Sequence, residues 1–169
     1  MRILYVGPLW VGGTCRQRYE ALRDLGHDIS GIDSDPLGLR VASHTLASRI
    51  RWRLYRHGLW CARPADVMEL NAAIRRHMAD GVEWDVLWLD KALAVEAETL
   101  ARVRVSFPRC RIAGYSPDDM TGRHNQSKAF RGHLWMYDIY FTTKSYCVGE
   151  LAALGCRRVE FVGNAYDPA

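Results

Sequence analysis

The sequence of 169 residues has no internal repeat, no low-complexity tract and no C-x-x-C cysteine spacing. Its five cysteines are an odd number scattered along the chain, so neither a disulfide framework nor a zinc site is indicated. Residues 1–7 are far too short for the apolar core of a signal peptide or a membrane span. We therefore expect a protein of the reducing cytoplasm.

The common nucleotide-binding signatures are also missing. The segment GPLWVGGT at residues 7–14 lacks the G-x-G-x-x-G spacing of dinucleotide-binding folds, which argues against a dehydrogenase. It has the G-x-x-x-x-G spacing of a Walker A loop, but Gly13 stands where the phosphate-binding lysine is required. An ATPase or GTPase is therefore not favoured, and no cofactor is expected.

What is present is ordinary globular composition, with 49% hydrophobic and 25% charged residues. The length falls within the usual range of one domain, so residues 1–169 are expected to form a single unit. The formal net charge is +4, and much of the basic character is concentrated between Arg40 and Arg63.

Short apolar runs alternate with longer segments of helical periodicity, which is typical of parallel strands joined by crossover helices. The expected strands are residues 2–6, 28–32, 85–89, 110–115, 138–142 and 158–162. The expected helices are residues 14–26, 39–59, 65–78, 93–105, 128–136 and 145–154. In the first of them Thr14 is the expected cap, Gln17 completes a capping box and Gly26 ends the helix. The pattern predicts a three-layer, Rossmann-like α/β fold, doubly wound, with a mostly parallel sheet of about six strands.

The loop that opens the first helix is a candidate anion site. Backbone N–H groups at Gly12, Gly13 and Thr14, together with the helix dipole, suit a negatively charged group, and Arg16 and Arg18 add positive charge. The alternative is a turn in which the glycines only permit tight geometry and the arginines are solvated.

Polar residues that follow two later strands are expected at the same edge of the sheet. Asp118 and Asp119 follow the strand at 110–115, where one carboxylate could act as a general base or orient a sugar hydroxyl. The alternative is a Pro-Asp turn and helix cap. Lys91 is placed to meet a phosphate, and His124 is a candidate base in a polar loop. The alternatives are the ordinary ones, a structural or solvated ion pair of Asp90 and Lys91 at the strand end and an exposed loop histidine. No metal site is expected.

The stretch from Arg40 to Trp60 mixes aromatic residues with Arg49, Arg51, Arg53 and Arg56. Such a helix can lie on an anionic membrane, here the inner face, or contact an acidic acceptor. The alternative is a surface helix whose arginines are solvated and whose aromatics pack on the sheet. No module for reading nucleic acid is visible, so no nucleic-acid partner is expected.

Four parts of the sequence form a recognisable succession: the opening MRILYVG with Gly12 and Gly13, the helical segment RYEAL at residues 18–22, the segment LGHDI at residues 25–29, and the stretch from residue 137 to residue 168. These parts resemble GT-B glycosyltransferases of the family-4-like and CgeB-like group. The likeness spans nearly the whole chain and corresponds to the N-terminal domain of that family.

The resemblance implies a domain that carries mainly the acceptor site. A second Rossmann-like domain, absent from this sequence, would hold most contacts to a nucleotide-sugar donor. It places Gly12 and Gly13 beside the donor phosphates or the acceptor, and Asp118 or Asp119 at a cleft position. The expected activity is metal-independent transfer of a hexose to an acceptor hydroxyl. The alternatives are a non-catalytic binding or regulatory domain and a different Rossmann-like enzyme.

Overall fold

The computed structural model describes residues 1–34, 46, 50, 69–122, 125–126 and 128–163. The strands are β1 (Arg2–Gly7), β2 (Asp28–Asp33), β3 (Val86–Asp90), β4 (Arg111–Ser116), β5 (Ile139–Thr142) and β6 (Val159–Phe161). They form one sheet in the order β2-β1-β3-β4-β5-β6, and every pair of neighbours is parallel. The Rossmann-like fold and all six expected strands are confirmed, each boundary to within about one residue.

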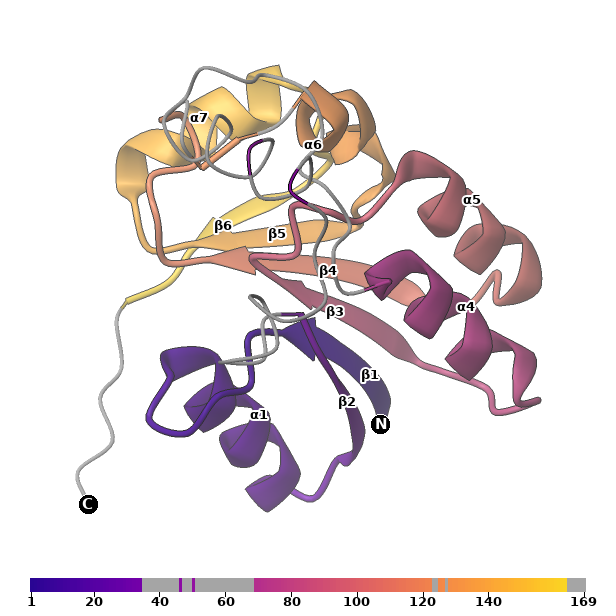
Figure 1. Cartoon of the computed structure of the whole chain (residues 1–169). Helices are drawn as coiled ribbons and strands as arrows, with labels where there is room; N and C mark the ends of the chain where they lie inside the picture. Colours follow the sequence, from indigo (N-terminus) through magenta and orange to yellow (C-terminus); the bar gives the residue numbers. More distant parts are fainter. Residues whose placement is uncertain (35–45, 47–49, 51–68, 123–124, 127, 164–169) are drawn as a thin grey trace.

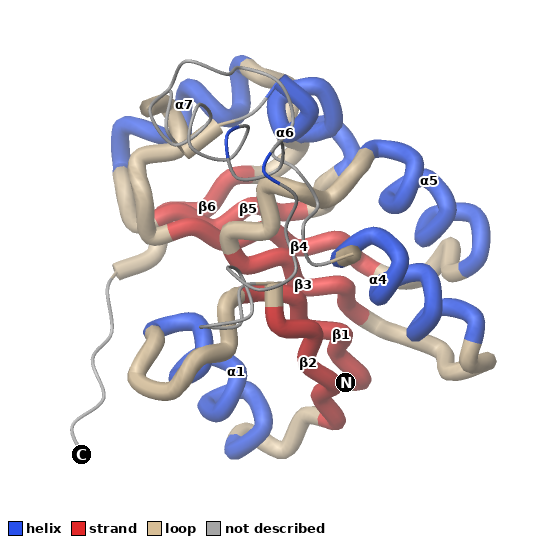
Figure 2. The backbone as a smooth tube through the Cα atoms, in the orientation of Figure 1, coloured by secondary structure: helices blue, strands red, loops and turns tan. Residues whose placement is uncertain are grey.

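Helices cover both faces of this sheet, unequally. The helices that the structure describes in full are α1 (Thr14–Asp24), α4 (Leu70–Ala79), α5 (Ala97–Ser106), α6 (Lys128–His133), followed by the 3-10 turn η1 (Leu134–Met136), and α7 (Ser145–Ala153). Figure 1 shows α1 on one side of the sheet and the other four helices on the opposite side. The right-handed rule for parallel crossovers explains this division. Across the sheet the chain moves in one direction from β1 to β2 and in the opposite direction at every later step, from β2 to β3 and on to β6. The helix of the first step therefore lies on one face and the helices of the later steps lie on the other (Figure 2).

Three helix starts differ from the sequence expectation. Helix α4 begins at Leu70 rather than at residue 65, directly after Glu69, whose φ of +50° is left-handed. The N-cap of α1 is Gly13, without a side-chain cap, so Thr14 is the first helical residue and the expected capping box does not form. Helix α5 begins at Ala97, four residues later than expected, because Asn71 of α4 holds the preceding loop. The Asn71 side chain donates to the Ala94 carbonyl at 3.0 Å and accepts from the Glu96 amide at 2.8 Å.

The end of α1 follows the sequence expectation. Gly26 has φ +83°, a left-handed conformation that glycine adopts without steric cost. The His27 amide donates to the Leu22 carbonyl at 3.3 Å and the Gly26 amide to the Arg23 carbonyl at 2.9 Å, which together form a Schellman motif.

The expected basic helix at residues 39–59 lies almost entirely outside the described residues, including Arg49, Arg51, Arg53 and Arg56. Only Leu46 and Ile50 are described there; both are helical and exposed. No helix in the described part of the chain is long and apolar enough to cross a membrane. Contact with a membrane surface stays a prediction.

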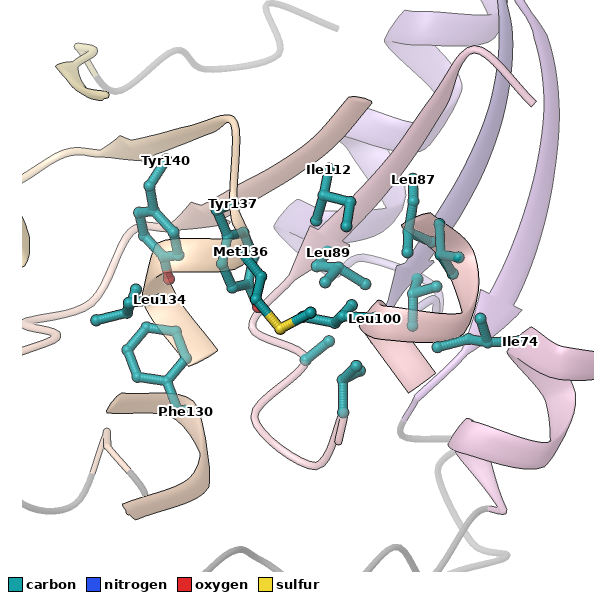
Figure 3. Packing of buried hydrophobic residues seen from close by; sticks show 14 of the residues in the cluster. Ile74, Leu87, Leu89, Leu100, Ile112, Phe130, Leu134, Met136, Tyr137 and Tyr140 are labelled. Carbon is teal, nitrogen blue, oxygen red and sulfur yellow. The ribbon is translucent and has the colours of Figure 1, made fainter. Parts of the chain in front are cut away.

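The main core lies between the sheet and the four helices of the larger layer. It is built from aliphatic side chains of the central strands and an aromatic group near α6 (Figure 3). The core residues labelled there are Ile74, Leu87, Leu89, Leu100, Ile112, Phe130, Leu134, Met136, Tyr137 and Tyr140. Rings of Phe130, Tyr137 and Tyr140 meet edge to face at 5.7–6.4 Å between centroids.

Gly114 of β4 leaves room for this aromatic group. A Cβ atom there would lie 2.9 Å from the Tyr137 ring and still closer to the ring of Tyr140. We expect Gly114→Ala to lower the free energy of unfolding by about 1–3 kcal/mol, because both rings are locked in the core. Gly149→Ala in α7 is the control: among the described residues nothing outside its own helix lies within 4 Å of a Cβ there, so alanine should stabilise by about 0.5–1 kcal/mol. Urea unfolding measures both, and equal stability of the two variants would contradict this packing.

His133 at the end of α6 is a buried, neutral histidine. Its Nε2 donates to the Val95 carbonyl at 3.1 Å, and its ring stacks on Tyr137. Burial lowers the pKa of His133 and outweighs the raising effect of the Val95 carbonyl.

This lowered pKa predicts a pH-dependent stability. The unfolded chain protonates His133 near its ordinary pKa of about 6.5 while the folded protein resists protonation, so stability is lost as pH falls below that value. We expect the melting temperature of His133→Gln to fall less between pH 7.5 and 5.5 than that of the wild type. Parallel thermal melts at the two pH values test this, and identical slopes would show that His133 is not responsible.

Candidate functional site

The order of the strands selects one edge of the sheet as the candidate site. β1 pairs with β2 on one side and with β3 on the other, and α1 and α5 leave these strands toward opposite faces. In open α/β sheets ligands bind outside the carboxyl ends of the strands at such a switch point. The loops after β1 and β3 therefore define the candidate site, and the loop after β4 adjoins it.

Asp90, the last residue of β3, is the centre of this edge. Its side chain is completely buried, and its Oδ2 accepts hydrogen bonds from the Tyr5 hydroxyl at 2.5 Å and from Arg18 Nε at 2.7 Å. Arg18 also lies over the Tyr115 ring, 4.1 Å from its centroid, so the guanidinium is held by a carboxylate and an aromatic face. This network joins β1, α1, β3 and β4.

The ionisation of this network is shifted by burial and by Asp90. Burial, followed by the negative charge of Asp90, raises the pKa of Tyr5 far above its ordinary value and that of Cys15 to about 12. Burial alone would lower the pKa of Arg18, but its hydrogen bond and ion pair with Asp90 outweigh burial and raise it. Tyr5 and Cys15 are therefore neutral and Arg18 is charged at physiological pH, which rules out Cys15 as a ready nucleophile.

Lys91 follows directly and turns the chain sharply. It has φ +53°, a left-handed conformation that costs a non-glycine residue energy, and its amide donates to the Tyr115 carbonyl at 3.1 Å. Its ammonium group lies 2.7 Å from Asp118 Oδ2, and the two side chains are 33% and 42% exposed. The structure thus brings together two residues that the sequence placed at this edge separately.

Asp119 has a different environment from Asp118. Its Oδ1 accepts from the Thr121 hydroxyl at 2.5 Å and from the amides of Thr121 and Gly122 at 2.9 and 3.2 Å. These hydrogen bonds, that of the Thr121 hydroxyl foremost, lower the pKa of Asp119. This is the turn geometry that the sequence offered as the alternative to a catalytic role.

In the loop between β1 and α1, the backbone geometry by itself explains why glycine stands at positions 12 and 13. Gly12 has φ +81°, a left-handed conformation. A Cβ at Gly13 would lie 3.0 Å from the Trp10 ring, and the Gly13 amide donates to the backbone carbonyl of Trp10. Arg16 pairs with Glu20 rather than facing the loop. The first-turn amides of α1, starting at Thr14, have no side-chain cap and remain suited to an anion.

His124 lies outside the described residues. In the described part of the chain no group of three His, Cys, Asp or Glu side chains is arranged to hold a metal ion. The sequence interpretation did not identify Tyr5 and Trp88 as parts of this edge. Tyr5 could have been found as a hydroxyl-bearing side chain among the aliphatic residues Ile3, Leu4 and Val6 of its strand. Trp88 could have been found by its position two residues before Asp90, which places both side chains on one face of the strand.

Comparisons with known proteins do not identify a family. No family model matches the chain, and no curated protein matches it. Among solved structures, shikimate dehydrogenase from Thermotoga maritima is similar over 94% of this chain and 86% of that chain, with 11% identity and a TM-score of 0.22. A similarity of this size carries no argument about function.

The two neighbouring acids should respond differently to substitution. Asp119→Ala removes the acceptor of three hydrogen bonds within one turn, so we expect it to lower the free energy of unfolding by about 1 kcal/mol. Asp118→Ala breaks only an exposed ion pair and should change stability by less than about 0.5 kcal/mol. Denaturant unfolding of both variants measures the difference, and a larger loss for Asp118 would contradict these assignments.

Proposed function

We propose that this chain is the acceptor-side domain of a sugar-transferring enzyme and that its ligand binds at the carboxyl edge of β1, β3 and β4. The resemblance of its motifs to GT-B glycosyltransferases supports this proposal. So does the Rossmann-like sheet, whose switch point lies beside the glycine loop, Lys91 and Asp118.

The observation that carries the proposal is the exposed ion pair between Lys91 and Asp118. An exposed pair is worth no more than about 1 kcal/mol, so a ligand can separate it at little cost. Once the 2.7 Å ion pair is opened, the two side chains offer a ligand one cation and one anion that lie close together. A substrate that combines a phosphate with sugar hydroxyls complements this pair of charges.

The chemistry of such a site divides between the two residues. Lys91 and the uncapped amides of α1 would stabilise negative charge on a leaving diphosphate, the kind of fixed electrostatic help that lowers transition-state energy. Asp118 would accept a hydrogen bond, or the proton, from the acceptor hydroxyl. Neither role requires a metal ion.

A second candidate is a binding domain without chemistry. Two of the three acids at this edge have structural contacts that a catalytic base would have to give up, because Asp90 is paired with Arg18 and Asp119 accepts hydrogen bonds from its own turn. Of the three, this leaves Asp118 as the exposed acid, and a site with few available acids favours binding without catalysis. Such a domain would bind the same ligand and hold it for another protein or domain.

Ligand binding by the 169-residue chain tests both candidates. We expect a nucleotide sugar such as UDP-glucose or GDP-mannose to bind weakly, and Lys91→Ala to weaken that binding about tenfold, the scale of one charge-assisted hydrogen bond. Arg102→Ala is the control, because Arg102 forms an exposed pair with Glu98 on α5. Calorimetric titration measures the affinities.

The outcomes separate the candidates. Binding that depends on Lys91, together with sugar transfer by the protein containing this domain that is lost in Asp118→Asn, supports the transferase. The same binding with no transfer supports the binding domain. Absence of binding by any nucleotide sugar, or equal effects of Lys91→Ala and Arg102→Ala, contradicts the proposed site.

A further inference from the structure

Trp88 and Asp90 lie two residues apart on β3, so their side chains project from the same face of the sheet. This is the face on which Tyr5 and Arg18 contact Asp90. The Tyr5 ring is nearly parallel to the Trp88 ring, at 8° and 6.4 Å between centroids, and its hydroxyl donates to Asp90 Oδ2. Tyr5 therefore adjoins both residues at the switch point.

Each of these two side chains has one buried polar atom that the rest of the network does not use. Trp88 Nε1 and Asp90 Oδ1 are inaccessible to solvent and have no hydrogen-bond partner within the described ranges of the chain. Buried polar atoms are nearly always paired. The indole of Trp84, which is also buried, follows that rule, because its Nε1 donates to the His77 carbonyl at 3.3 Å.

The two atoms have opposite hydrogen-bonding character. An indole N–H only donates, and a carboxylate oxygen only accepts. A phosphate oxygen could accept from Trp88 but would be repelled by Asp90, and an ammonium group could donate to Asp90 but cannot accept from Trp88. A hydroxyl group does both.

We propose that Trp88 Nε1 and Asp90 Oδ1 form a buried site for one hydroxyl group, which accepts from the indole and donates to the carboxylate. Two sources share this chemistry. One is an internal water molecule, for which two or more polar partners are the usual requirement. The other is a hydroxyl of a bound sugar; this second source rests on the proposed function, whereas the first does not.

Nuclear magnetic resonance of the whole 15N-labelled chain tests the site directly. The indole N–H signal of Trp88, assigned by its loss in Trp88→Phe, should show a cross-peak to a long-lived water in the free protein if water is the occupant. The indole of Trp84 is the matched control, because it is buried and donates to a peptide carbonyl, so it should show no such cross-peak.

Titration with UDP-glucose distinguishes the two sources. If a sugar hydroxyl enters the site, the Trp88 signal should shift and any water cross-peak should disappear. Trp88→Phe, which keeps an aromatic ring beside Tyr5 but lacks the N–H, should then bind about tenfold more weakly, the effect of one hydrogen bond. If water is the resident group, the cross-peak should persist with the sugar bound and Trp88→Phe should bind normally.

A Trp88 indole signal with no water cross-peak in the free protein and no response to the sugar would overturn the site. The cross-peak is read from the wild-type chain, and if Trp88→Phe does not fold, the Trp88 signal is assigned instead by through-bond experiments on the wild type. A chain that binds no sugar but shows the water cross-peak would contradict the proposed function and retain the hydroxyl site, so the two failures are distinguishable.

Discussion

The buried carboxylate of Asp90 is the constraint around which this edge of the domain is organised. A carboxylate removed from water is strongly unfavourable unless it is paired and hydrogen-bonded. Here the Tyr5 hydroxyl and the Arg18 guanidinium supply the donors, the first from β1 and the second from α1. Removal of Arg18 would leave an uncompensated charge in the interior, so α1 is held against the switch point by electrostatics as well as by packing.

The backbone around Asp90 follows from the same constraint. A Cβ at Gly7, the last residue of β1, would lie 3.0 Å from the Asp90 Cβ, so the absence of a side chain there allows Asp90 to pack closely against β1. The chain then leaves β3 through Lys91 in a left-handed conformation, held by the Tyr115 carbonyl of β4. That turn directs the Lys91 side chain to Asp118.

The two ion pairs at this edge differ in what a ligand can do to them. The pair between Arg18 and Asp90 is buried on the carboxylate side, and breaking a buried pair by removing one partner costs about 3–5 kcal/mol. The pair between Lys91 and Asp118 is exposed and weak, so water or a ligand can replace either partner. The buried pair therefore belongs to the scaffold, and the exposed pair is the one through which we propose that a ligand binds.

The sequence by itself determined the parallel α/β class and the positions of six strands, because the alternation of short apolar runs with helical segments depends only on local periodicity. It also determined the end of α1 at Gly26, since the left-handed position there requires glycine. Tertiary structure decided that α5 begins only after the loop held by Asn71, that Asp118 meets Lys91, and that Asp119 belongs to a turn. Only the tertiary structure brought Tyr5 to Trp88 and Asp90, because these side chains meet through the register of β1 against β3. That register pairs residues more than eighty positions apart, and no local sequence pattern encodes it.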